Sequence, residues 1–130
     1  MEIKIGQKAS FTKTISESDI YTFAGISGDF NPVHVNEEEA RNSIFGERIA
    51  HGMLGASLIS TVLGTKLPGP GTIYMGQSLS FKAPVYIGDT ICATVEVKEL
   101  LPKHQAVLNT MVKNQNDTIV IDGEALVKLP

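Results

Sequence analysis

Residues 53–63 most constrain the fold of this chain, because their side chains are apolar or small nearly all round. A helix with this pattern is stable only when neighbouring structure buries it on most sides. Gly52 precedes the segment and Gly64 follows it, and we expect Gly64 to end the helix. Small residues recur along one line of this helix, at Gly52, Ala56, Ser60 and Gly64. Such a stripe permits either close packing of the helix on a sheet or the approach of a ligand.

Beyond a loop at residues 66–71, apolar residues recur with a period of two, which indicates strands. Four strands are predicted there, at residues 73–82, 90–99, 105–113 and 118–128. A fifth strand precedes all the helices, at residues 9–15. Because the four later strands follow one another with short connections, we expect an antiparallel meander.

This order of elements predicts an α+β domain over residues 1–130, with one antiparallel sheet wrapped around the central apolar helix. The length is that of an ordinary single domain with a real core. A five-stranded sheet of this kind leaves an edge exposed, and exposed edges are usually paired or covered. We therefore expect a homodimer, or a higher homo-oligomer, that forms edge to edge through residues 73–82.

Two shorter helices are predicted before the central one. Ser16 is expected to be an N-cap, with Asp19 three residues on in a variant of the capping box. This first helix is expected to stop at Gly28. Asn36 is expected to cap a second helix whose first turn is Glu37-Glu38-Glu39, where negative charge suits the positive end of the helix dipole. The acidic run therefore needs no catalytic role.

Residues 27–34 place a carboxylate, Asp29, and an imidazole, His34, five residues apart. Gly28 tolerates positive φ and Pro32 restricts the residue before it, so we expect a fixed turn here and no regular helix. Such a turn can aim Asp29 and His34 at one point, as acid–base chemistry on a bound water requires. From these residues alone, an Asx-type turn beside a hydrogen-bonded histidine is an equally good interpretation.

Charge and cysteine content narrow the classes of partner and site. The net charge is −3 and no cluster of Lys or Arg is present, which argues against nucleic acid or an anionic membrane as a partner. The longest weakly polar run is too short to span a bilayer, and the N-terminus lacks the apolar region of a signal peptide, so we expect a cytoplasmic protein. Cys92 is the only cysteine, which excludes an internal disulfide and argues against a thiolate metal cluster. We expect neither a metal nor a cofactor.

Four stretches carry a likeness to one known family: DFNPVH at residues 29–34, IAHGML at 49–54, IYMGQSLSFK at 73–82 and PVYIGD at 84–89. In this order and spacing they resemble the MaoC-like, R-specific enoyl-CoA hydratases, which have the hot-dog fold. The resemblance covers nearly the whole chain. Its length is similar to that of the short bacterial enzymes of this family that feed polyhydroxyalkanoate synthesis.

The resemblance implies reversible syn hydration of a trans-2-enoyl-CoA to the (3R)-3-hydroxyacyl-CoA. By the same resemblance, Asp29 and His34 hold the attacking water, and which of them removes the proton and which returns it stays open. Gly52 offers its backbone N–H to the thioester carbonyl. Ser60 matches a serine of the family's active-site surroundings, and Asn31 is a candidate for holding the turn beside the substrate. The acyl-CoA thioester is thus the expected partner.

Other functions are compatible with parts of this pattern. A 3-hydroxyacyl-[acyl-carrier-protein] dehydratase differs in the carrier and not in the chemistry. A hot-dog thioesterase would use a carboxylate or glutamine on the central helix, and residues 53–63 carry no carboxylate. A non-catalytic acyl-CoA-binding module would not need both Asp29 and His34. Of the other histidines, we expect His51 to cap or pack the central helix and His104 to be solvated.

Overall fold

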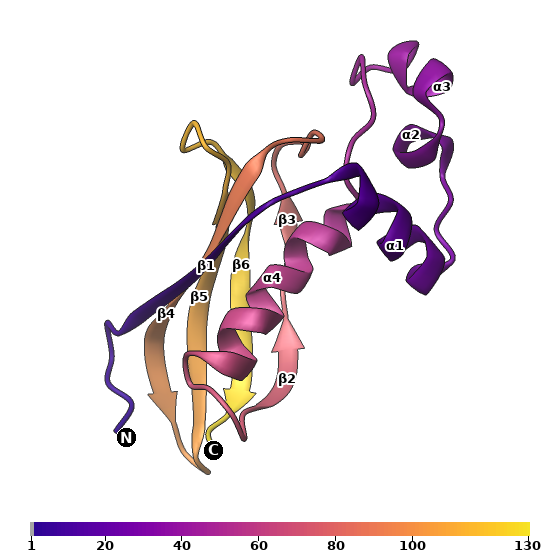
Figure 1. Cartoon of the computed structure of the whole chain (residues 1–130). Coiled ribbons are helices and arrows are strands. Elements are labelled where there is room, and N and C mark those ends of the chain that lie inside the picture. The colour runs from indigo at the N-terminus through magenta and orange to yellow at the C-terminus, as the bar shows by residue number, and fades with distance from the viewer. Residues whose placement is uncertain (1) are drawn as a thin grey trace.

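Helix α4 lies along one face of an antiparallel sheet in the computed structural model, which describes residues 2–130 (Figure 1). Three shorter helices, α1 to α3, lie beyond one end of the sheet (Figure 1). In chain order the elements are β1 (Lys8–Thr14), α1 (Glu17–Ser27), α2 (Pro32–Val35), α3 (Glu37–Arg41), α4 (Gly52–Thr65), β2 (Ile73–Gln77), β3 (Ser80–Phe81), β4 (Thr90–Leu101), β5 (Gln105–Lys113) and β6 (Ile119–Lys128).

The strands lie in the order β1-β4-β5-β6-β2, and β3 also pairs with β6. All pairs are antiparallel, with Ala9 opposite Val95 in the β1–β4 pair and Leu108 opposite Ala125 in the β5–β6 pair. The predicted α+β class, an antiparallel sheet around a central helix, is therefore confirmed. The predicted meander is correct only for β4, β5 and β6. Strand β2 pairs with β6 and not with β4, the next long strand in the chain. The reason is that residues 82–89 carry the chain from the β6 end of the sheet across to β4, next to the opposite edge strand β1.

The single strand predicted at residues 73–82 is two strands, β2 and β3, so the sheet has six strands and not five. Between them, the Ser78 N–H donates to the Glu124 carbonyl (2.9 Å), and Ser78 Oγ accepts from the Glu124 N–H (2.9 Å). Gly123 permits this approach of the two backbones, because a Cβ there would lie 1.9 Å from the Ser78 carbonyl oxygen. The interruption carries Phe81 of β3 to the first turn of α4.

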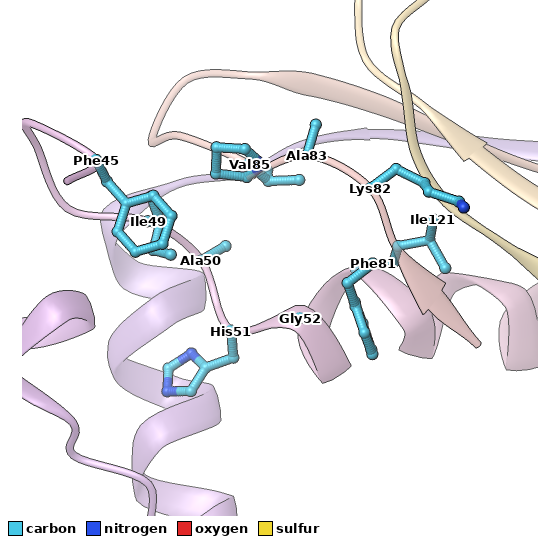
Figure 2. Close-up of a pocket in the computed structure, with 12 residues that line it drawn as sticks. Phe45, Ile49, Ala50, His51, Gly52, Phe81, Lys82, Ala83, Val85 and Ile121 are labelled. Carbon is cyan, nitrogen blue, oxygen red and sulfur yellow. The ribbon is translucent and has the colours of Figure 1, made fainter.

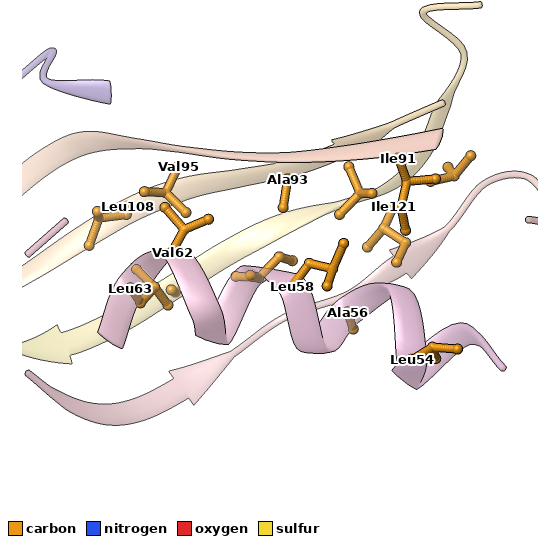
Figure 3. Close-up of a cluster of buried hydrophobic side chains, with 14 of the residues drawn as sticks. Leu54, Ala56, Leu58, Val62, Leu63, Ile91, Ala93, Val95, Leu108 and Ile121 are labelled. Carbon is orange, nitrogen blue, oxygen red and sulfur yellow. The ribbon is translucent and has the colours of Figure 1, made fainter. Parts of the chain in front are cut away.

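The core lies between α4 and the sheet (Figure 3). Alternate residues of β4 are fully buried, as a period of two requires: Ile91, Ala93, Val95 and Val97. They pack with the sheet-facing residues of α4, which include Leu58, Ile59, Val62 and Leu63. In a single chain the other side of α4 is open, since Met53 is 56% exposed and Ser57 and Ser60 are also exposed. In a single chain, α4 is therefore buried only on the side that faces the sheet, and the expected burial on most of its sides is not reached.

Helix α4 is longer than predicted, because Gly64 lies inside it and the helix continues to Thr65. The Lys66 N–H still donates to the Val62 carbonyl (2.9 Å), which extends the helix by one residue beyond Gly64. A glycine permits a left-handed helix end and does not impose one, and at this position the helical bonds prevail.

The start of α1 has the predicted capping box. Ser16 Oγ accepts from the Asp19 N–H (3.0 Å), and Asp19 Oδ2 accepts from the Ser16 N–H (2.9 Å). Ile15 and Ile20, which flank this cap, are fully buried. The helix ends at Gly28, whose φ of 79° and N–H bond to the Ala24 carbonyl form a left-handed C-cap. The cap at Asn36 is confirmed as well, since its Oδ1 accepts from the Glu39 N–H (3.1 Å).

The loop before α4 is fastened to α1 by the buried guanidinium of Arg48. It donates to the Glu17 carboxylate and to the Tyr21 hydroxyl (2.8 Å). The hydrogen bond to Glu17 holds the pKa of Arg48 above its ordinary value. This contact fixes the entry to α4 relative to α1. Among residues 2–130, no helix combines the length and the apolar character needed to cross a membrane.

Candidate active site

Asp29 follows the end of α1 in a turn made by short-range side-chain hydrogen bonds. Ser27 Oγ accepts from the Asp29 N–H (3.2 Å), and Asp29 Oδ1 accepts from the Asn31 N–H (3.1 Å). The left-handed conformation of Gly28 reverses the chain between α1 and this turn. The Asp29 side chain is thereby held on the surface of a single chain. The Asx-type turn considered for this segment is therefore present.

The expectation that residues 27–34 contain no regular helix is wrong for the last three of them. Pro32 begins the short helix α2, where a proline is tolerated because the first N–H of a helix needs no intrahelical acceptor. Asn31 is its N-cap, with Oδ1 accepting from the Val33 N–H (3.2 Å). The structure thus has Asn31 holding this segment, and α2 places His34 on its inner side.

The His34 ring is buried, with 7% of the residue exposed. Its Nδ1 lies 2.8 Å from the carbonyl oxygen of Ile49. A carbonyl oxygen only accepts hydrogen bonds, so Nδ1 carries the proton and donates. In the neutral ring, Nε2 therefore has the lone pair, and it can accept a hydrogen bond or a proton.

His51, the residue before α4, contacts both Asp29 and His34. Its Nε2–H donates to the backbone carbonyl of Asp29 (2.9 Å). Its ring stacks on the His34 ring, with centroids 3.9 Å apart and planes inclined by 24°. It also contacts the Phe23 ring, with centroids 4.9 Å apart and planes inclined by 54°. His51 occupies the N-cap position of α4, as expected, although its side chain makes no capping hydrogen bond. Its ring packs as expected too, since it is buried against His34 and Phe23.

One carboxylate oxygen of Asp29 and one ring nitrogen each of His34 and His51 lie within 4.8 Å of one another. The structure therefore brings together the carboxylate and imidazole that the sequence singled out. The same set of atoms could suggest a metal site. The stacked rings argue against one, because imidazole lone pairs lie in the ring plane, and two nearly parallel planes do not direct them at a common ion. This cluster suits a small hydrogen-bonded molecule such as water.

Gly52 is the first residue of α4, and no side chain caps this helix. The first N–H groups of a helix have no intrahelical acceptor, and the helix dipole adds positive potential there. The Phe81 ring lies against Gly52, since a Cβ at Gly52 would be 2.7 Å from Phe81 Cε1. An oxygen that gains negative charge would be stabilised at this helix end.

Two adjoining pockets meet at the beginning of α4, and His51, Gly52 and Phe81 line both. The first, of about 430 Å³, contains the Asp29–His34 pair; its other lining residues are Phe23, Ser27 and Met53. The second, of about 410 Å³, lies between the loop at residues 45–52 and the segment at residues 81–85 (Figure 2). Both volumes are in the range of small-ligand sites. The carboxylate, the imidazole and the helix end thus share one cleft.

Ser60 is not brought to this cleft. It is exposed and lies eight residues after Gly52, about 12 Å further along the helix axis. Neither of the two pockets has Ala56, Ser60 or Gly64 in its wall. The small-residue stripe therefore reaches the site only at Gly52, and a role for Ser60 stays a prediction.

Phe81 and the contacts of His51 were missed by sequence reasoning. Phe81 belongs to the alternating pattern of residues 73–82, and nothing in that pattern indicates that its ring lies against Gly52. For His51, the only signal is its position next to Gly52. His104 is exposed as expected, and its Nε2 lies 3.0 Å from the Pro130 carbonyl oxygen.

Comparison with known proteins agrees with this architecture. Residues 2–120 match the family model described as MaoC like domain. The chain is 58% identical to the (R)-specific enoyl-CoA hydratase of Rhodospirillum rubrum, over 99% of this chain and 90% of that protein. It is 48% identical to the 3-hydroxybutyryl-CoA dehydratase of Methylorubrum extorquens, over 99% of this chain and 82% of that protein.

A solved structure is similar over nearly its full length. It is the (R)-hydratase from A. caviae involved in PHA biosynthesis, which superposes with a TM-score of 0.96 at 46% identity and covers 98% of both chains. These similarities agree with the hot-dog fold expected from the sequence. The placement of residues 29–34 beside the start of α4 agrees with it as well. The chain belongs to the MaoC-like domain family.

Proposed function

We propose that this protein catalyses the reversible syn hydration of trans-2-enoyl-CoA to (3R)-3-hydroxyacyl-CoA, as a hydro-lyase. The observation that carries the proposal is the convergence of Asp29, His34 and the uncapped start of α4 on one cleft. This reaction needs a group that handles the protons of water and a site for a developing enolate oxygen. Similarity at 58% identity to an (R)-specific enoyl-CoA hydratase supports the same reaction.

The Gly52 N–H would bind the thioester carbonyl. When water adds to C3, negative charge moves onto the thioester oxygen, and a helix N-terminus stabilises it with an N–H donor and the dipole. In enzymes that use an oxyanion site, one such donor lowers the activation barrier by about 3 kcal/mol. Glycine at this position lets the Phe81 ring lie against the start of α4, because a Cβ there would be 2.7 Å from Phe81 Cε1.

Asp29 and His34 would hold and deprotonate one water molecule. The neutral His34 ring has its lone pair on Nε2, because Nδ1–H is bonded to Ile49, and the Asp29 carboxylate is a second acceptor. The water's O–H proton passes to this pair, its oxygen bonds to C3, and a proton from the pair is delivered to C2. Since one cluster serves both steps, water and proton add to the same face of the double bond.

A CoA thioester is the substrate that the comparisons support. The relatives from R. rubrum and M. extorquens carry names that specify CoA substrates. The carrier-protein dehydratase considered from the sequence would act on the same acyl group. Rates with crotonyl-CoA and with crotonyl acyl-carrier protein separate the two, and we expect the CoA thioester to give the higher kcat/KM.

We also propose that the protein acts as a homodimer joined through the edge strand β2. Apolar side chains on this strand are exposed in a single chain, with Ile73 at 56%, Tyr74 at 41% and Met75 at 48%. An exposed apolar edge is normally paired or covered. Light scattering at micromolar concentration should give twice the mass of the chain. A fully active monomer would contradict this proposal.

The direct test of the activity is the hydration of crotonyl-CoA. Loss of the ultraviolet absorbance of the conjugated thioester gives the rate, and chiral analysis of the product gives its configuration. We expect the (3R) product, and the reverse reaction from (3R)-3-hydroxybutyryl-CoA. Binding of crotonyl-CoA without turnover would instead indicate a non-catalytic acyl-CoA-binding module, and release of free CoA would indicate a thioesterase.

A further inference from the structure

The ring of His51 contains the only buried side-chain nitrogen or oxygen atom without a hydrogen-bond partner among the described residues 2–130. That atom is Nδ1, and the residue is 3% exposed. A buried polar atom without a partner destabilises a fold, and a phenylalanine at this position would avoid the penalty. Packing alone therefore does not explain a histidine at this position, and the contacts of its other ring atoms offer the explanation.

Two of those contacts end on the two residues assigned to the water. The Nε2–H donates to the Asp29 carbonyl at 2.9 Å, in the turn that carries the carboxylate. The ring face stacks on His34 at 3.9 Å, so it restricts rotation of the His34 ring about the bond that aims Nε2. Phe23 also packs against the His51 ring, with centroids 4.9 Å apart. His51 is also the residue before Gly52, whose N–H is assigned to the thioester oxygen.

We propose that His51 is a positioning residue, which holds the Asp29 turn and the His34 ring in register with the start of α4. This inference rests on the proposed hydratase function. We assign His51 no proton transfer, because its Nε2–H is bonded to the Asp29 carbonyl and its buried Nδ1 has no hydrogen-bond partner in the protein.

Two substitutions separate the contacts of His51. His51→Phe keeps a flat ring that stacks on His34 and removes the N–H donor. His51→Gln keeps an amide N–H and removes the stacked ring. The matched control is His104→Phe, which removes another ring nitrogen bonded to a backbone carbonyl, far from the cleft. All variants are assayed as full-length protein with crotonyl-CoA, and their thermal melts are recorded beside the wild type.

For His51→Phe we expect kcat to fall about 10-fold, the size of losing one orienting hydrogen bond, with KM changed less than about twofold. Its melting temperature should equal or exceed that of the wild type, because the unpaired Nδ1 is gone and water can reach the exposed Asp29 turn. His51→Gln should lose activity as well and melt lower. His104→Phe should keep wild-type kcat.

A background that lacks the carboxylate tests whether His51 acts through Asp29. In Asp29→Asn, adding His51→Phe should slow the reaction by much less than 10-fold, because residues that act together are not additive. Equal loss in both backgrounds would overturn the proposal, as would wild-type kcat in a folded His51→Phe. If His51→Phe does not fold, wild-type kcat in folded His51→Gln overturns it in the same way. A wild type without hydratase activity would overturn both this inference and the proposed function, whereas an active wild type with an indifferent His51 overturns only the inference.

Discussion

Replacement of Gly52 by valine tests the assignment of the helix end as the site for the thioester oxygen. A Cβ at this position would lie 2.7 Å from Phe81 Cε1 and 2.9 Å from Phe81 Cδ1. Both distances are too short, so the ring has to move. Because Phe81 is 53% exposed and the contact is with the far end of its side chain, the ring can turn away without moving the backbone. The valine methyl groups then occupy the space beside the Gly52 N–H.

The effect on stability should be small. Turning the ring off its preferred rotamer costs about 1 kcal/mol, and replacing glycine in a helix returns up to about 1 kcal/mol. The free energy of unfolding should therefore change by less than about 1 kcal/mol, equivalent to a shift of the melting temperature of less than about 5 °C. The activity should change far more, because the valine methyl groups block the thioester carbonyl from the backbone N–H of residue 52. We expect kcat for crotonyl-CoA to fall about 10²-fold, or about 2.7 kcal/mol in the barrier.

Two controls show whether the loss comes from the oxygen site. Gly64→Val makes the same change near the other end of α4, where nothing lies within 4 Å of the added Cβ, and should keep its activity. Combining Gly52→Val with Phe81→Ala removes the crowded ring, and the loss should persist. Turnover near the wild-type value in a folded Gly52→Val variant would refute the assignment of Gly52. Recovery in the double variant would show that the displaced Phe81 ring, and not the blocked N–H, causes the loss.

Two further predictions concern stability. The hydrogen bond from the Ser16 N–H, and after it Lys13, hold the pKa of Asp19 below its ordinary value. This carboxylate therefore stabilises the fold above its unfolded pKa and stops doing so as the pH falls through its folded pKa. Urea unfolding should show wild type more stable than Asp19→Asn at pH 6, with the difference shrinking below about pH 4; a constant difference would contradict this. Gly123→Ala should lower the free energy of unfolding by about 3 kcal/mol or more, since its Cβ would lie 1.9 Å from the Ser78 carbonyl oxygen. A melt within 2–3 °C of the wild type, less than about 1 kcal/mol, would show that β6 and the 78–79 bend adapt.

Features set by neighbouring residues could be predicted from the sequence. The capping box of Ser16 and Asp19, the left-handed end at Gly28 and the cap at Asn36 each depend on contacts within four residues, and all three are present. The proximity of Asp29 and His34 was also predicted, although by a turn, whereas Asn31 and Pro32 begin a short helix there.

Features that depend on distant partners could not be predicted in this way. The pairing of β2 with β6 joins segments far apart in the chain, and the interruption at Ser78 needs the space left by Gly123, which is 45 positions away. The contact of Phe81 with Gly52 and the stack of His51 on His34 likewise join separate elements. A period of two identifies a strand and its faces, but it does not identify the strand's neighbour. Both residues that the sequence missed at the site are of this kind.

The central claim is that Asp29 and His34 act as one unit on a single water, and a double-mutant cycle tests it most directly. Asp29→Asn keeps the shape of the side chain and removes its charge, and His34→Ala removes the Nε2 acceptor. Hydration of crotonyl-CoA is measured for both single variants, the double variant and the wild type. Each single change should lower kcat by about 10²–10⁴-fold with little effect on KM, and the double variant should be hardly slower than the slower single one. Two small losses that multiply in the double variant would contradict the claim, because they would mean that these residues only shape the turn.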